Sequence, residues 1–94
     1  MELKVTVSEL RSAASKLEQQ LGEFEAAAKE AKAAADDLAG KWEGDAQKAF
    51  VSEQQKNDVW FNQMTKVGMT YVQALRSAAA AYEAADAAAK GAIG

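Results

Sequence analysis

The chain contains no cysteine, no proline and no histidine among its 94 residues. Without cysteine no disulfide can cross-link the fold, and the thiolate and imidazole ligands that usually hold zinc or iron are missing. The absence of proline removes the residue most hostile to helix interiors. We therefore expect a fold stabilised by packing alone, with no metal, no cofactor and no cysteine- or histidine-based catalysis.

Long apolar runs are also missing, and the net charge is small. No window approaches the roughly 20 apolar residues that cross a bilayer, and residues 1–7 contain no signal-peptide core. Eleven basic and fourteen acidic side chains give a formal net charge of -3, which repels nucleic acid and anionic lipid. We expect no Sec-type signal, no nucleic-acid partner and no stable membrane insertion.

Alanine, by contrast, fills 23 positions. Because Ala loses no side-chain entropy in a helix, this composition predicts an all-α protein, and the length indicates a single domain over residues 1–94. Thr6-Val7-Ser8-Glu9 reads as a capping box that begins the first helix.

The first helix is predicted over about residues 7–39. Its apolar positions alternate in steps of four and three, which is a heptad pattern; they are Leu10, Ala14, Leu17, Leu21, Phe24, Ala28, Ala31, Ala35 and Leu38. Gly40 is expected to end the helix in the left-handed conformation, residues 40–44 form the turn, and Asp45 is a candidate N-cap for the next helix.

A second helix is predicted over about residues 45–89, followed by a flexible tail over 90–94. Its apolar stripe comprises Ala46, Ala49, Phe50, Trp60, Met64, Val67, Tyr71, Leu75, Ala78, Tyr82 and Ala85. Phe61 and Val72 lie beside the stripe and widen it to roughly 140°. Asn57 interrupts the stripe, either to fix helix register or at a solvent-facing edge.

The two stripes predict an antiparallel two-helix hairpin. Pairing from the turn sets Ala35 beside Phe50, Phe24 beside Trp60, Leu17 beside Val67, and Leu10 beside Leu75. Since two helices share one interface and the stripes are wider than that, we expect two hairpins to form a four-helix bundle. The residues expected to pack within the hairpin or the dimer are Leu10, Leu17, Leu21, Phe24, Phe50, Trp60, Phe61, Met64, Val67, Tyr71 and Leu75.

The predicted helices differ in length by roughly 18 Å at 1.5 Å per residue. The second helix should therefore overhang the first from about Ser77 onward. That overhang would carry Tyr82 and Asp86, which lie one turn apart on the same face.

Two motifs now stand together: Trp42-Glu43-Gly44 in the turn, and Tyr82-Glu83-Ala84-Ala85-Asp86 near the end of the second helix. A small acidic helical hairpin with both resembles the WXG (Trp-X-Gly, hundred-residue) family, the early-secreted-antigen-like substrates of bacterial type VII secretion. The resemblance implies a dimer exported in the folded state from the bacterial cytoplasm by a signal-peptide-independent route, driven by an FtsK/SpoIIIE-type ATPase. It also implies an export signal formed by Trp42, Gly44, Tyr82 and Asp86.

Other interpretations stay open at this point. Trp42 could simply cover the closed end of the hairpin, Gly44 could serve only the tight turn, and Tyr82 could be an ordinary stripe residue. The partner could be a second copy of the chain or a paralogous WXG protein. The chain could also be a cytoplasmic coiled-coil adaptor, or a chaperone-like partner of another secreted helical protein. An enzyme is not expected, because two extended helices offer no obvious concavity.

Overall fold

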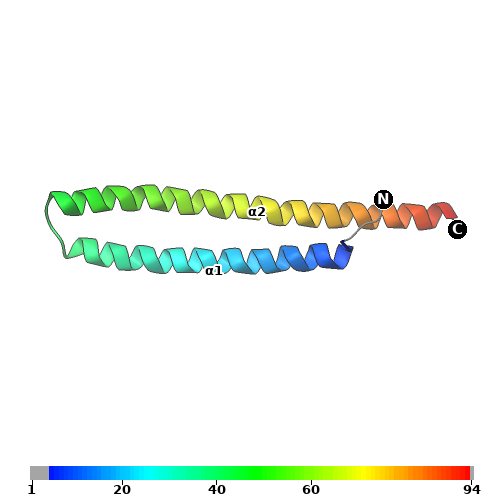
Figure 1. Cartoon of the computed structure of the whole chain (residues 1–94), viewed down its shortest axis with the longest axis horizontal. Coiled ribbons are helices and arrows are strands. Elements are labelled where there is room, and N and C mark those ends of the chain that lie inside the picture. The colour runs from blue at the N-terminus through cyan, green and yellow to red at the C-terminus, as the bar shows by residue number, and fades with distance from the viewer. Residues whose placement is uncertain (1–4, 94) are drawn as a thin grey trace.

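The computed structural model describes residues 5–93 and consists of two long helices. Helix α1 spans Val7–Gly40 and helix α2 spans Asp45–Ile93. Figure 1 shows them side by side and antiparallel, joined by a short turn at one end, while α2 projects beyond α1 at the other. No strand occurs within residues 5–93. The predicted all-α hairpin is confirmed.

The start of α1 follows from its cap. Thr6 has extended backbone, and its hydroxyl accepts a hydrogen bond from the Glu9 amide at 3.1 Å. The Leu10 amide then donates to the Thr6 carbonyl at 3.0 Å, which is the first helical bond. The bond from Glu9 satisfies one of the first amides, which a helix otherwise leaves without partners, so the helix begins where the sequence predicts.

The end of α2 differs from the prediction. The helix continues to Ile93, whereas the sequence predicts its end at residue 89 and a flexible tail from Lys90. The run of alanines before Lys90 favours helix strongly enough that the single glycine at position 91, which costs about 1 kcal/mol relative to Ala, does not end it. Gly94 lies outside the described residues.

The helices pack through one face each. On α1 the buried and half-buried positions that match the predicted heptad are Leu10, Ala14, Leu17, Leu21, Phe24, Ala28 and Ala35. The prediction is wrong at Ala31, which is exposed, and at Leu38, which is 54% exposed while its neighbour Ala39 is buried. On α2 the corresponding positions include Phe50, Gln54, Phe61, Thr65, Gly68, Val72, Leu75 and Ala79. Within the described residues, the buried hydrophobic side chains are Ala14, Ala39, Val72 and Ala79.

The inner face of α2 is rotated from the predicted one. Phe24 packs against Phe61, with ring centroids 5.5 Å apart in an edge-to-face arrangement, and the predicted pairing of Phe24 with Trp60 is wrong. Leu17 likewise does not bury Val67, which is 46% exposed. Thr65 and Gly68 lie on the inner face instead, because their small side chains let the α1 side chains approach. A prediction based on apolar residues alone does not place a threonine and a glycine there.

The hairpin is long and thin. Its extents are 75 × 19 × 16 Å, and its radius of gyration is 21.4 Å, against about 12 Å for a compact domain of this length. The accessible surface is 7260 Å², whereas a compact monomer of 10.0 kDa would expose about 5,200 Å². A single hairpin therefore leaves much of its surface in water.

Candidate functional site

The closed end of the hairpin is fastened by backbone and side-chain bonds. The amides of Lys41 and Trp42 donate to the carbonyls of Leu38 and Ala39 at 3.1 and 3.3 Å. From α2, the Gln47 side-chain amide donates to the Ala39 carbonyl at 3.2 Å. These bonds satisfy carbonyls at the end of α1 without a left-handed glycine, and Gly40, predicted to be left-handed, is an ordinary last residue of the helix.

Gly44 is the residue that needs a special backbone. Its φ is 112°, a backbone conformation that residues other than Gly rarely adopt. The Lys48 amide donates to the Gly44 carbonyl at 3.2 Å, so Gly44 stands at the cap position of α2. Asp45, predicted as the N-cap, is instead the first helical residue, where its carboxylate is favoured by the helix dipole.

Trp42 lies against Phe50, in the second turn of α2. Its ring centroid is 5.8 Å from that of Phe50, and the residue is still 37% exposed. The side chain therefore contributes to closing the hairpin and also presents a surface at its tip.

The open end brings Tyr82 and Asp86 to the start of α1. Both residues line a shallow cavity together with Val5, Thr6 and Ser8. Helix α2 projects beyond α1 as predicted (Figure 1), but the overhang does not start at Ser77, since Tyr82 and Asp86 still lie beside residues 5–8. Val5 and Thr6, which precede α1, line the same cavity and so lengthen the part of α2 that is covered.

An ion pair fixes this end. Arg11 donates from Nε to Glu83 Oε1 at 3.1 Å and from Nη2 to Glu83 Oε2 at 2.9 Å. A second pair joins Arg76 of α2 to Glu18 of α1 at 2.6 Å. Both pairs are about half exposed, so they contribute more to orientation than to overall stability.

A further polar cluster lies nearer the turn. Lys32 donates to Asp36 at 3.0 Å, and Gln54 of α2 donates to the other oxygen of the same carboxylate. The hydrogen bond from Lys32, followed by that from Gln54, lowers the pKa of Asp36 below its ordinary 3.8. The hydrogen bond and charge of Asp36, with the charge of Asp58, raise the pKa of Lys32 above 10.5.

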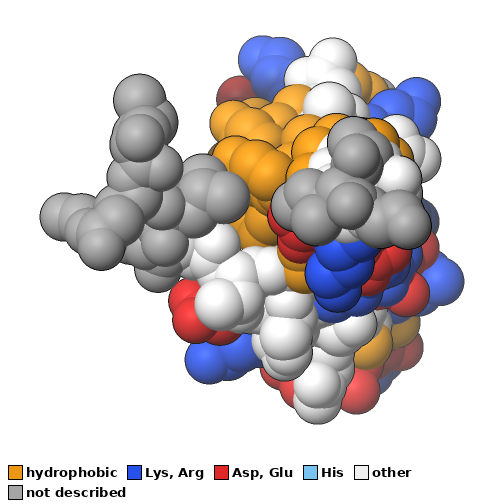
Figure 2. Space-filling model, turned by 90° about the vertical axis from the view of Figure 1, so that its right-hand side faces the viewer, with side chains coloured by type: hydrophobic (Ala, Val, Ile, Leu, Met, Phe, Trp, Pro, Cys, Tyr) orange, Lys and Arg blue, Asp and Glu red, His pale blue; other side chains and the backbone are white. Residues whose placement is uncertain are grey.

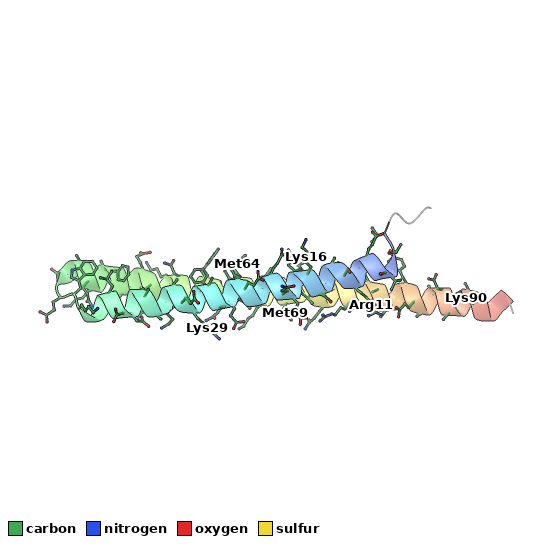
Figure 3. The ribbon with its side chains drawn as sticks, turned by 90° about the horizontal axis from the view of Figure 1, so that it is seen from below. Arg11, Lys16, Lys29, Met64, Met69 and Lys90 are labelled. Atoms are coloured by element: carbon green, nitrogen blue, oxygen red, sulfur yellow. The ribbon has the colours of Figure 1, made fainter. Side chains whose placement is uncertain are left out.

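One exposed face of α2 carries a row of apolar side chains. Trp60, Met64, Val67 and Tyr71 follow one another at helical spacing on α2 and are each 41–61% exposed; we call them the outer stripe. Figure 3 shows Met64 on one long edge of the hairpin and Lys29 on the other. Viewed from the open end, hydrophobic side chains gather over one side of the molecule (Figure 2).

The described residues offer little for chemistry on a small molecule. Within residues 5–93, no three Asp, Glu, His or Cys side chains are grouped closely enough to hold a metal ion. None of the helices in that range has the length and apolar character needed to span a bilayer. The cavities are grooves between the helices.

The structure brings together some predicted site residues and separates others. Tyr82 and Asp86 lie together, whereas Trp42 and Gly44 lie at the turn, the other end of the long axis (Figure 1). The sequence interpretation missed Arg11 and Glu83. Their opposite charges and antiparallel positions are the signal that could have indicated them, but only with the register known to within one turn.

Comparison with known proteins gives a family. The family model WXG100, described as proteins of 100 residues with WXG, matches residues 2–87. No curated protein and no solved structure matches the chain. The matched range includes the Trp42-Glu43-Gly44 turn and the Tyr82 to Asp86 segment. The chain belongs to the WXG100 family, the small helical proteins that type VII systems secrete.

Proposed function

We propose that this chain is exported in the folded state as a homodimer, a four-helix bundle, and acts through helix-to-helix protein binding rather than catalysis. The observation that carries the proposed dimer is the outer stripe of Trp60, Met64, Val67 and Tyr71, and membership of the WXG100 family supports export. Contiguous exposed apolar surface of this kind marks a protein interface.

The surface area supports a second copy as the occupant. The hairpin exposes about 2,000 Å² more than a compact monomer of its mass. If each chain buried that excess, the interface would total about 4,000 Å², which falls within the range of obligate homodimers. A paralogous hairpin of similar shape would cover the stripe equally well, and the measured mass distinguishes the two.

The export signal is proposed to comprise Tyr82 and Asp86 with Trp42 and Gly44. In an antiparallel dimer the open end of one hairpin would lie near the turn of the other, so the two halves of the signal would meet between chains. An FtsK/SpoIIIE-type ATPase is proposed to recognise this signal, and the proposed destination is outside the bacterial cell.

Light scattering on the purified chain tests the dimer. We expect twice 10.0 kDa, and a fall to the monomer mass when Val67→Glu places a charge on the outer stripe. Ser52→Glu, at an exposed position of α2 outside the stripe, is the matched control and should leave the mass unchanged. A pure, well-folded monomer at high dilution would contradict the dimer.

Secretion is tested in a host that carries a type VII machine. We expect the chain in the culture supernatant, and its loss when Tyr82→Ala is introduced or when the secretion ATPase is inactivated. Retention of the unaltered chain in the cytoplasm would favour a coiled-coil adaptor, the second candidate. The outer stripe favours the adaptor as much as the exported dimer, because each needs a helical partner.

A further inference from the structure

The last part of α2 is not held by the hydrophobic core. Ala79 is the last buried residue of the helix, and the positions from Ala80 to Gly91 are all exposed. Segments with few buried contacts open locally at little free energy. Something other than core packing must therefore keep the part of this stretch that lies beside α1, up to Asp86, in place.

The Arg11–Glu83 pair supplies that connection. Both nitrogen-to-oxygen contacts are short, at 3.1 and 2.9 Å, and they join α1 to α2 in the two-pronged geometry that fixes direction as well as distance. Glu83 falls between Tyr82 and Asp86. Because successive helix residues lie about 100° apart, holding Glu83 toward Arg11 also sets the direction in which Tyr82 points.

Tyr82 is correspondingly covered on one side. Although it follows the last buried residue of α2, it is only 39% exposed, and the neighbours across its cavity are residues 5–8 at the start of α1. Arg11 and Glu83 line the adjacent hollow with Ser8 and Ser12. The Arg11–Glu83 pair and the cavity lined by Tyr82 therefore form one continuous surface.

We propose that Arg11 is a positioning residue for the export signal: by holding Glu83, it keeps Tyr82 and Asp86 seated against the start of α1. This role rests on the proposed function. The signal is then not a short linear motif but a surface to which both ends of the chain contribute.

The chain supplies a matched control. Arg76 and Glu18 form a second Arg–Glu pair between the helices, through one contact of 2.6 Å, with side chains that are about as exposed as those of Arg11 and Glu83. Val72 and Ala79, both buried, hold α2 in place on either side of Arg76. Breaking this second pair removes the same kind of contact without freeing the signal.

The experiment compares Arg11→Ala with Glu18→Ala. We expect Arg11→Ala to lower the amount exported by about two- to fivefold, the population change that follows loss of one exposed pair, and Glu18→Ala to leave export unchanged. Hydrogen exchange should become faster in the amides of residues 82–87 in Arg11→Ala only. The exchanged pair, Arg11→Glu with Glu83→Arg, should restore both readouts.

The outcomes separate the two levels of the proposal. If the unaltered chain is not exported, the proposed function is overturned, and the role of Arg11 in export falls with it. If the unaltered chain is exported and Arg11→Ala leaves the cell equally well, only the positioning role is overturned. Failure of the exchanged pair to restore export would overturn it too.

Discussion

At the residue scale, Gly68 shows how a small side chain shapes the interface. A Cβ placed there would lie 2.3 and 2.8 Å from the two methyl carbons of Leu21, which is far closer than real contacts allow. Gly22, the neighbour of Leu21 in the sequence, has nothing within 4 Å of the same position. One glycine receives a leucine from the facing helix, and the other has no packing role.

This difference predicts opposite effects of one substitution. Gly22→Ala should stabilise the hairpin by about 1 kcal/mol, because Ala is the better helix former. Gly68→Ala should destabilise it by about 1 kcal/mol, because the strain of overpacking exceeds the same helix gain. Urea unfolding measures both. In a Leu21→Ala background the Gly68→Ala change should become stabilising, and an unchanged penalty there would contradict the contact.

Asp36 predicts a dependence of stability on pH. Its pKa is lowered in the folded chain by the hydrogen bond from Lys32 and then by that from Gln54. A lowered folded pKa means that the contribution is present above 3.8 and is lost as the pH falls through the folded value. Carbon-detected NMR of the carboxyl group should show titration below 3.8, returning toward 3.8 in Lys32→Ala. Titration at the ordinary value in the unaltered chain would refute the contact.

At the scale of the element, α2 has two apolar faces and uses one of them inside the hairpin. Val72, with no exposed surface, lies on the inner face. Tyr71, its neighbour in the chain, is 61% exposed on the outer stripe. The helix is therefore built to contact α1 on one side and something further on the other.

A pair of valines in α2 tests this assignment. Val72→Ala should cost about 2–3 kcal/mol, because it removes two buried carbons and leaves a cavity. Val59→Ala is the control, since Val59 is 57% exposed, and should change stability by less than about 0.5 kcal/mol. Thermal unfolding followed by circular dichroism measures both. Equal costs for the two variants would show that the inner face is misassigned.

The sequence predicts the elements well and their rotation poorly. The Thr6 cap, most of the α1 heptad and the place of the turn follow from local patterns, although the left-handed glycine is Gly44 and not Gly40. On α2 two apolar stripes lie about 100° apart, and the larger side chains of Trp60 and Met64 favour the wrong one. Gly68 and Thr65 take inner positions because of the shape of the facing helix, which no local pattern encodes.

The candidate site shows the same limit. The Trp42 to Gly44 turn and the Tyr82 to Asp86 spacing are visible in the sequence. The contact of Tyr82 with the start of α1 includes Val5 and Thr6, which precede the helix, and a comparison of helix lengths alone therefore placed Tyr82 on the overhang. The Arg11–Glu83 pair spans 72 positions of the chain, beyond the reach of any local pattern.

At the scale of the whole molecule, the two parts of the proposed export signal are far apart within one chain. The turn with Trp42 lies at one end of a molecule 75 Å long, and Tyr82 lies toward the other (Figure 1). A contact between them can therefore arise only between two molecules. Because the chain contains no cysteine, introduced thiols would report on that contact without background.

Mixing two singly substituted chains tests the antiparallel dimer. Lys41→Cys marks the turn and Ala81→Cys marks the open end, both at exposed positions that spare Trp42 and Tyr82. With a short bifunctional maleimide we expect crosslinked dimers from the refolded mixture and almost none from either variant alone, because each thiol faces the opposite end of its partner. A parallel dimer would reverse this result, since Lys41→Cys would then link efficiently to itself. Crosslinks in neither case would mean that no second hairpin covers the outer stripe, and the shared export signal would be excluded with it.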